Sequence, residues 1–122
     1  MANDFKRFAK PSVGTSTGAS ADAVYTVPAG AGSSALESII IGITLANKTS
    51  TGVTASVFLD NEDGSNDVFI VKDAIVPAGS SLEIMSGNKL VVQNDGSNAD
   101  VIRISCGTGS ALDAIVTVLE DV

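Results

Sequence analysis

The sequence predicts an all-β fold, an antiparallel β-sandwich of about eight strands with a jelly-roll-like arrangement and an extended N-terminal arm. Three observations predict it. Segments rich in β-branched residues recur along the chain at a spacing of about 8–14 residues. Turn signals such as Pro-Ala-Gly and Asp-Gly separate these segments. The two segments that could be helical contain runs of Ile or of Val and Thr, which favour an extended chain.

Eight segments are expected to be strands. The longest, 36–47, has a continuous apolar centre, whereas the segment 52–60 begins with strict alternation. With a period of two, alternate residues of a strand share one face. In the segment 52–60, one face is shared by Val53, Ala55 and Val57. In the last segment, 111–120, one face is shared by Leu112, Ala114, Val116 and Val118. The predicted strands are 23–27, 36–47, 52–60, 67–72, 81–85, 89–93, 100–106 and 111–120.

Two turn sequences occur twice. Val27-Pro28-Ala29-Gly30 and Val76-Pro77-Ala78-Gly79 are identical, and proline at the second position with glycine at the fourth favours a β-turn. Asp63-Gly64-Ser65-Asn66 is repeated as Asp95-Gly96-Ser97-Asn98, and Asp-Gly between strands predicts a hairpin. The repeats are expected at two similar edges of the sandwich. An ancient duplication and the repeated use of favourable turns both explain them.

The N-terminal residues differ from the rest, which divides the chain into an arm or linker at 1–21 and a β-sandwich domain at 22–122. Residues 11–21 are rich in Ser, Thr, Gly and Ala, a composition typical of linkers. We expect the arm to dock on an acidic neighbour, either another copy or an assembly partner, and a solvated terminus is the alternative. The candidate interface residues are the basic and aromatic side chains of the arm: Phe5, Lys6, Arg7, Phe8 and Lys10.

Composition excludes the common catalytic designs. The 122 residues contain no histidine and a single cysteine, Cys106. A Ser-His-Asp triad, a Cys-His pair and a zinc site with histidine ligands are therefore impossible. Cys106 ends an alternating apolar run and is expected to be a small buried hydrophobe. We expect no enzymatic activity and no cofactor.

Charge and hydropathy restrict the partners. The formal net charge of −7 would repel nucleic acid, so we expect no nucleic-acid partner. No apolar run approaches the roughly 20 residues that span a bilayer, and the first residues do not resemble a secretory signal. The expectation is a protein made in the cytoplasm, with no membrane partner.

One acidic loop is a candidate ligand site. The segment 60–67 carries a calcium candidate formed by Asp60, Asp63 and Asp67. The order of these residues does not fit the helical calcium loop, so a solvated hairpin is the preferred interpretation and no metal is predicted. Host glycan could also bind at these acidic loops. Three strand carboxylates, Glu37, Glu83 and Glu120, could in principle act on a sugar, but no aromatic platform accompanies them, since the chain has one Tyr and no Trp.

The chain also resembles a family. Its strand and turn motifs are similar to those of small virion structural proteins of tailed bacteriophages, notably phages of marine and cyanobacterial hosts. The resemblance covers residues 1–120 and departs at 61–66 and 95–99, where the loops look enlarged. None of its motifs is catalytic. They are Tyr25-Thr26-Val27-Pro28-Ala29-Gly30, Gly42-Ile43-Thr44-Leu45-Ala46-Asn47, Ile70-Val71-Lys72-Asp73, Val76-Pro77-Ala78-Gly79-Ser80-Ser81-Leu82-Glu83 and Gly87-Asn88-Lys89-Leu90.

The resemblance implies a mechanical function in the virion. The first expectation is a capsid decoration, or cement, protein that stabilises the head through interfaces with the major capsid protein or other virion proteins. A homo-oligomer, with a trimer preferred, would suit an icosahedral shell. The alternatives are a tail, baseplate or fibre component and a module that binds host glycan.

Overall fold

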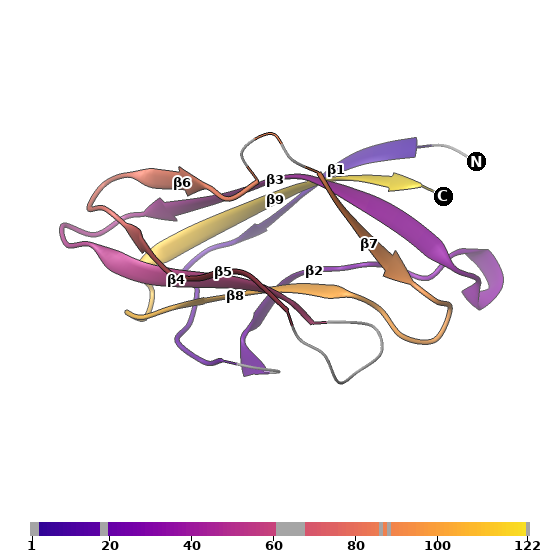
Figure 1. The fold of residues 1–122 in the computed structure, drawn as a ribbon, viewed down its shortest axis with the longest axis horizontal. Coiled ribbons are helices and arrows are strands. Elements are labelled where there is room, and N and C mark those ends of the chain that lie inside the picture. Colours follow the sequence, from indigo (N-terminus) through magenta and orange to yellow (C-terminus); the bar gives the residue numbers. More distant parts are fainter. Residues whose placement is uncertain (1–2, 18–19, 61–67, 86, 88, 122) are drawn as a thin grey trace.

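The computed structural model confirms the all-β prediction (Figure 1). It describes residues 3–17, 20–60, 68–85, 87 and 89–121. A short 3-10 turn, η2 (Ala31–Ser33), lies between the second and third strands. The described residues form nine strands: β1 (Asn3–Lys10), β2 (Asp22–Thr26), β3 (Leu36–Asn47), β4 (Val53–Asp60), β5 (Val68–Val76), β6 (Ser81–Glu83), β7 (Leu90–Asn94), β8 (Val101–Cys106) and β9 (Leu112–Asp121).

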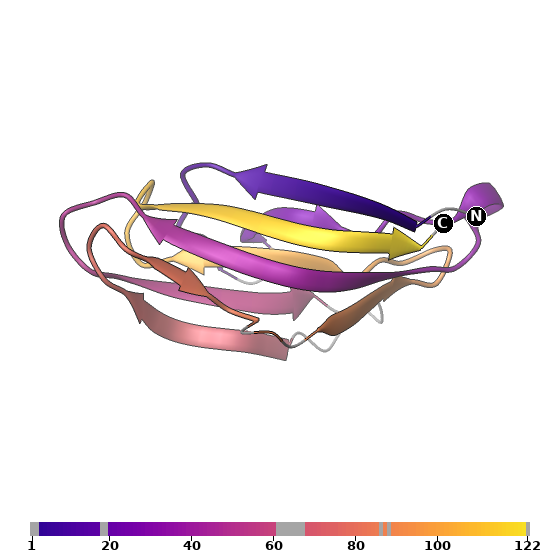
Figure 2. The same ribbon diagram turned by 90° about the horizontal axis from the view of Figure 1, so that it is seen from above.

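The strands form two antiparallel sheets that pack face to face (Figure 2). We call the sheet with strand order β1-β9-β3-β6 the upper sheet, in which β7 also pairs with β3. The lower sheet has the order β2-β8-β4-β5. β6 and β7 pair with different ends of β3, so they act as one interrupted strand. Counted in this way, each sheet has four strands in the order of a jelly roll, as predicted.

The N-terminal residues differ from the expected arm. Residues Asn3–Lys10 form β1 and pair with β9 in continuous register, from Asn3 opposite Asp121 to Lys10 opposite Ala114. β1 is an edge strand of the upper sheet (Figure 2). Its pairing with β9 satisfies backbone groups of both strands. The predicted arm therefore contains a strand of the sandwich.

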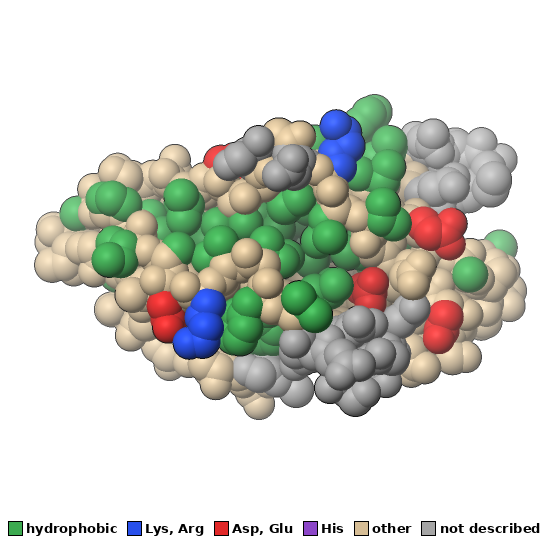
Figure 3. Space-filling view, in the orientation of Figure 1, with side chains coloured by type: hydrophobic (Ala, Val, Ile, Leu, Met, Phe, Trp, Pro, Cys, Tyr) green, Lys and Arg blue, Asp and Glu red, His purple; other side chains and the backbone are tan. Residues whose placement is uncertain are grey.

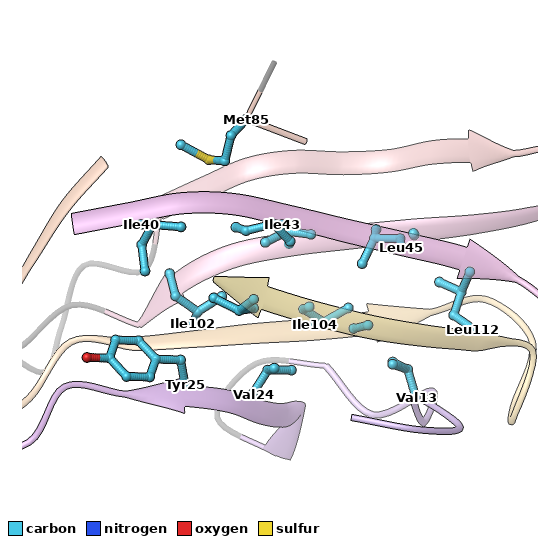
Figure 4. Close-up of a cluster of buried hydrophobic side chains, with 14 of the residues drawn as sticks. Val13, Val24, Tyr25, Ile40, Ile43, Leu45, Met85, Ile102, Ile104 and Leu112 are labelled. Atoms are coloured by element: carbon cyan, nitrogen blue, oxygen red, sulfur yellow. The ribbon is translucent and has the colours of Figure 1, made fainter. Parts of the chain in front are cut away.

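The core lies between the two sheets and follows the predicted alternation. Ile40, Ile43 and Leu45 of β3 face Ile102 and Ile104 of β8 across the sandwich (Figure 4). All five side chains are buried. The predicted apolar faces of β4 and β9 are also buried: Val53, Ala55, Val57, Leu112, Ala114, Val116 and Val118.

The core reaches the surface along one open side of the sandwich. Figure 3 shows hydrophobic side chains gathered between the β6–β7 edge of the upper sheet and β5 of the lower sheet. Met85, which follows β6, is buried at this side. The partly buried residues packed against the core from β5, β6, β7 and the adjoining loop are Ile70, Leu82, Ile84 and Leu90.

The predicted turns form in part. Asp95 closes the β7–β8 hairpin, because its N–H donates to the carbonyl of Asn98 at 3.0 Å. Backbone N–H groups of Asn98 and Ser97 donate to its carboxylate, which lowers the pKa of Asp95. After β5, the Ser80 N–H donates to the Pro77 carbonyl at 3.1 Å, so the second Pro-Ala-Gly sequence makes a turn. The first Pro-Ala-Gly sequence makes no such turn, and the Gly30 N–H donates to the Ser34 carbonyl at 2.8 Å instead.

Candidate assembly surface

The outward face of the upper sheet carries apolar side chains. Successive residues of a strand point to opposite faces of the sheet. On β9, Val116 and Val118 point into the core, where they are buried. The residue after Val118, Leu119, therefore points away from the core. On β1, Phe8 packs against the core, so Phe5 lies on the opposite, outward face.

Strand register joins four of these side chains into one row. Phe5 of β1 lies opposite Leu119 of β9, and Leu119 lies opposite Ile39 of β3. Ile39 in turn lies opposite Val91 of β7. We call Phe5, Leu119, Ile39 and Val91 the apolar row. It crosses four adjacent strands, which come from both ends and the middle of the chain.

The ends of the apolar row are exposed. Phe5 retains 76% and Val91 61% of the accessible surface of their residue types. Ile39 and Leu119 between them are half-buried. A second exposed hydrophobe on this face is Ile115, which lies opposite Ala9 on β1 and Thr44 on β3. Contiguous exposed apolar surface on a soluble protein commonly marks an interaction site.

Charged residues flank the apolar row at opposite ends. Arg7 lies two residues from Phe5 on β1 and is exposed. Glu37 lies two residues from Ile39 on β3, is exposed and pairs with Gln93 of β7. Arg7 forms no ion pair with any described residue. A partner with an acidic group opposite β1 would therefore complement this surface.

The inner side of β1 is held by a buried polar network. Glu120 of β9 is buried beneath β1, and Lys6 Nζ lies 2.9 Å from its Oε1 atom. The Tyr25 hydroxyl donates to Glu120 Oε2 at 2.7 Å and lies 2.9 Å from Ser38 Oγ. The Phe8 and Tyr25 rings also pack together, with centroids 4.7 Å apart. These contacts fix the position of β1, and with it Phe5.

The network shifts two pKa values upward. The hydrogen bond to Glu120, followed by charge attraction to the same carboxylate, raises the pKa of Lys6. Burial is the main cause of the raised pKa of Tyr25. Lys6 is therefore charged and Tyr25 neutral at physiological pH, which is the combination that a buried carboxylate requires.

The structure places the five predicted interface residues in three different environments. Phe5 and Arg7 are exposed on the outward face or edge. Lys6 and Phe8 contact Glu120 and Tyr25 of their own chain, so in this structure they are engaged within the fold. Lys10 is half-buried at the end of β1. Ile39, Val91 and Leu119 were not among the predicted interface residues. The alternation in 111–120 was the available signal for Leu119, because it puts this residue on the face opposite to Leu112, Ala114, Val116 and Val118.

The calcium candidate is not assembled by the described residues. Asp60 Oδ2 accepts a hydrogen bond from Arg103 Nε at 2.8 Å, so this carboxylate already has a cationic partner. Asp63 and Asp67 lie outside the described residues. In the part of the chain that the structure describes, no group of three or more His, Cys, Asp or Glu residues is placed to hold a metal.

The three strand carboxylates are not brought together. Glu83 lies on the outward side of the upper sheet and accepts hydrogen bonds from the Ile43 N–H and the Thr44 hydroxyl. Glu120 lies on the inner side of the same sheet. Glu37 is exposed on the far part of β3. Paired acid–base chemistry by these residues has no support in this geometry.

The comparisons with known proteins do not assign this chain to a family. Protein-family models, curated proteins and solved structures yield no match to this chain. Among the described residues, no helix has the length and apolar character needed to cross a membrane.

Proposed function

We propose that this chain is a non-enzymatic structural protein of a bacteriophage virion and that it acts as a capsid decoration protein. The observation that supports this proposal is the apolar row. Its residues lie on the outward face of a complete sheet, where they contribute little to the core. Their removal from water by a neighbouring subunit would contribute about 25 cal/mol per Å² of apolar surface.

Strand geometry makes this face suitable for a permanent contact. The row is carried by β1, β9, β3 and β7, so its side chains are fixed by backbone pairing. A rigid surface loses little conformational entropy when it binds. A standard interface buries about 1,600 Å² in total, and the outward face of a four-stranded sheet offers the broad, continuous surface that such an interface needs.

Two further arguments support a virion. The motifs from Tyr25 to Leu90 resemble those of small structural proteins of tailed phages, and jelly rolls occur in viral capsid proteins. A fold alone does not determine function, so the fold supports the proposal only together with the surface. The proposed partners are the major capsid protein or other virion proteins, together with further copies of this chain, preferably as a trimer.

Copy number tests the proposal. The experiment is quantitative mass spectrometry of purified particles of the phage that encodes the chain, combined with deletion of its gene. Decoration predicts many copies per particle and heads that break at lower temperature or lower osmotic stress after deletion. A few copies per particle, with intact heads but defective adsorption or tail assembly, would instead support a tail, baseplate or fibre component. Absence of the chain from purified particles would overturn the virion proposal.

A further inference from the structure

The lower sheet carries a cavity on its outward face, away from the apolar row. Its volume is about 400 Å³. Strands β4, β5 and β8 form its walls, and the segment between β1 and β2 contributes Thr15 and Thr17. Two phenylalanines, Phe58 and Phe69, line it with their rings 5.6 Å apart between centroids. The cavity therefore combines an aromatic surface with hydroxyl groups.

An irregular stretch of β5 shapes the charged part of the cavity. The β4–β5 register shifts between Ala55 and Val57 and again between Val57 and Phe58. Asp73 has a φ of 53°, a conformation that non-glycine residues seldom adopt. Its N–H donates to the Ser56 hydroxyl at 3.0 Å. Bulges and strained residues of this kind are concentrated at functional sites.

The charges at the cavity balance one another. Lys72 Nζ lies 3.1 Å from Asp73 Oδ2, and the same ammonium lies 5.7 Å from the centre of the Phe69 ring. The pair offers both a donor and an acceptor without a net charge. A strongly anionic ligand would gain little here, because Asp73 opposes it and the chain carries a net charge of −7.

The Ser105 hydroxyl is a polar group of the cavity without a partner among the described residues. Ser105 of β8 lines the cavity and is only 6% exposed, yet no described residue hydrogen-bonds its hydroxyl. The hydroxyl is reachable from the cavity, so it can bind a polar group of a ligand. A purely apolar ligand would cover this hydroxyl without offering it a hydrogen bond.

We propose that the cavity binds an uncharged saccharide. A pyranose ring presents C–H groups on its faces, which pack on aromatic rings, and hydroxyl groups at its edge, which bind polar side chains. Phe69 supplies the aromatic face, whereas Ser105 and the Lys72–Asp73 pair supply hydrogen-bonding groups. The site lies on the sheet opposite to the proposed assembly surface, so it is independent of the virion proposal and would remain open in an assembled particle.

The test uses the purified full-length chain. A glycan array is combined with titrations of ¹⁵N-labelled protein by methyl glycosides of glucose, galactose, mannose and N-acetylglucosamine at millimolar concentrations. We expect at least one saccharide to shift the amide signals of Ser56, Lys72, Asp73 and Ser105. Phe69→Ala and Ser105→Ala should each weaken binding by about tenfold.

A matched control is available on the same strand. Ile75 of β5 is 69% exposed and does not line the cavity, so Ile75→Ala should bind as tightly as the unaltered chain. Amide spectra show whether each variant is folded, and Phe69→Ala alone decides the test if Ser105→Ala unfolds. Three outcomes would overturn the proposal: no signal with any saccharide, shifts that map outside the cavity, or binding that Phe69→Ala leaves unchanged.

Discussion

Lys6 and Glu120 join the first and last strands of the fold, with Lys6 Nζ 2.9 Å from Glu120 Oε1. Glu120 is only 2% exposed, so its charge has to be balanced within the protein. Lys6 supplies the opposite charge and Tyr25 supplies a hydrogen bond. β1 is therefore coupled to the core by electrostatics as well as by backbone pairing, and the outward position of Phe5 depends on this coupling.

The hydroxyl of Tyr25 should contribute measurably to stability. Tyr25→Phe retains the ring but removes the donor to Glu120 Oε2, leaving a buried carboxylate oxygen without that bond. We expect the free energy of unfolding to fall by about 1–3 kcal/mol. Urea denaturation measures this loss. Ser38→Ala is the control, because it removes a neighbour of the Tyr25 hydroxyl and leaves the bond to Glu120 intact. Equal stability of Tyr25→Phe and the unaltered chain would show that the network is not stabilising.

The raised pKa values of Lys6 and Tyr25 predict a loss of stability at alkaline pH. Both groups keep their protons to higher pH in the folded chain than in the unfolded chain. Stability from these groups is therefore complete below about pH 10, the ordinary range of both side chains, and declines as the pH rises above it.

Lys6→Met isolates the lysine contribution to this decline. The variant should be less stable than the unaltered chain at pH 7, because Glu120 loses its cationic partner. The difference between the two chains should shrink as the pH rises through the pKa of folded Lys6. Thermal melts at several pH values between about 7 and 12 measure it. A constant difference over the whole range would contradict the proposed ion pair.

The β7–β8 hairpin contains a glycine with no room for a side chain. Gly96 has a φ of 100°, and a Cβ atom there would clash with the Ser33 carbonyl oxygen. Gly79 also has a positive φ, of 64°, but open space surrounds it. Gly79→Ala should cost about 1 kcal/mol through its backbone alone. Gly96→Ala should cost clearly more because the backbone of η2 would have to move. Chemical denaturation of the two variants tests this order. Equal losses in the free energy of unfolding would show that the backbone at Ser33 moves aside at little cost.

Substitutions in the apolar row should separate assembly from folding. Phe5→Ser and Val91→Ser affect side chains that are mostly exposed, so each should change the free energy of unfolding by no more than about 0.5 kcal/mol. Their incorporation into particles should nevertheless fall sharply. Ile75→Ser is the matched control, since the exposure of Ile75 lies between those of Phe5 and Val91 but Ile75 is on the lower sheet. Normal incorporation of both row variants would show that the row is not an interface.

Much of the sandwich could be predicted from local sequence. The range 36–47 agrees with β3 at both ends, and the Asp95-Gly96 hairpin forms as expected. The buried face of β9 follows directly from its period of two. These features depend on neighbouring residues, which is why a single sequence reveals them.

The apolar row and the first strand could not be predicted from the sequence, because both form through contacts between residues far apart in the chain. Lys6 and Arg7 made the N-terminal segment look like a basic arm that docks on an acidic neighbour, because the sequence does not show that Glu120 is buried beside Lys6. Likewise, Phe5 and Val91 fall in one row only through the register of the strands between them. The cavity could not be predicted from the sequence for the same reason, since β4, β5 and β8 shape it together.

An electron-microscopy map of the phage particle would test the assembly surface most directly. The map has to be detailed enough to orient the two sheets of this chain. We predict that Phe5 and Val91 are covered by a neighbouring subunit and that the outward face of β4, β5 and β8 is open to solvent. A chain whose upper sheet faces solvent, with Phe5 and Val91 uncovered, would contradict the account.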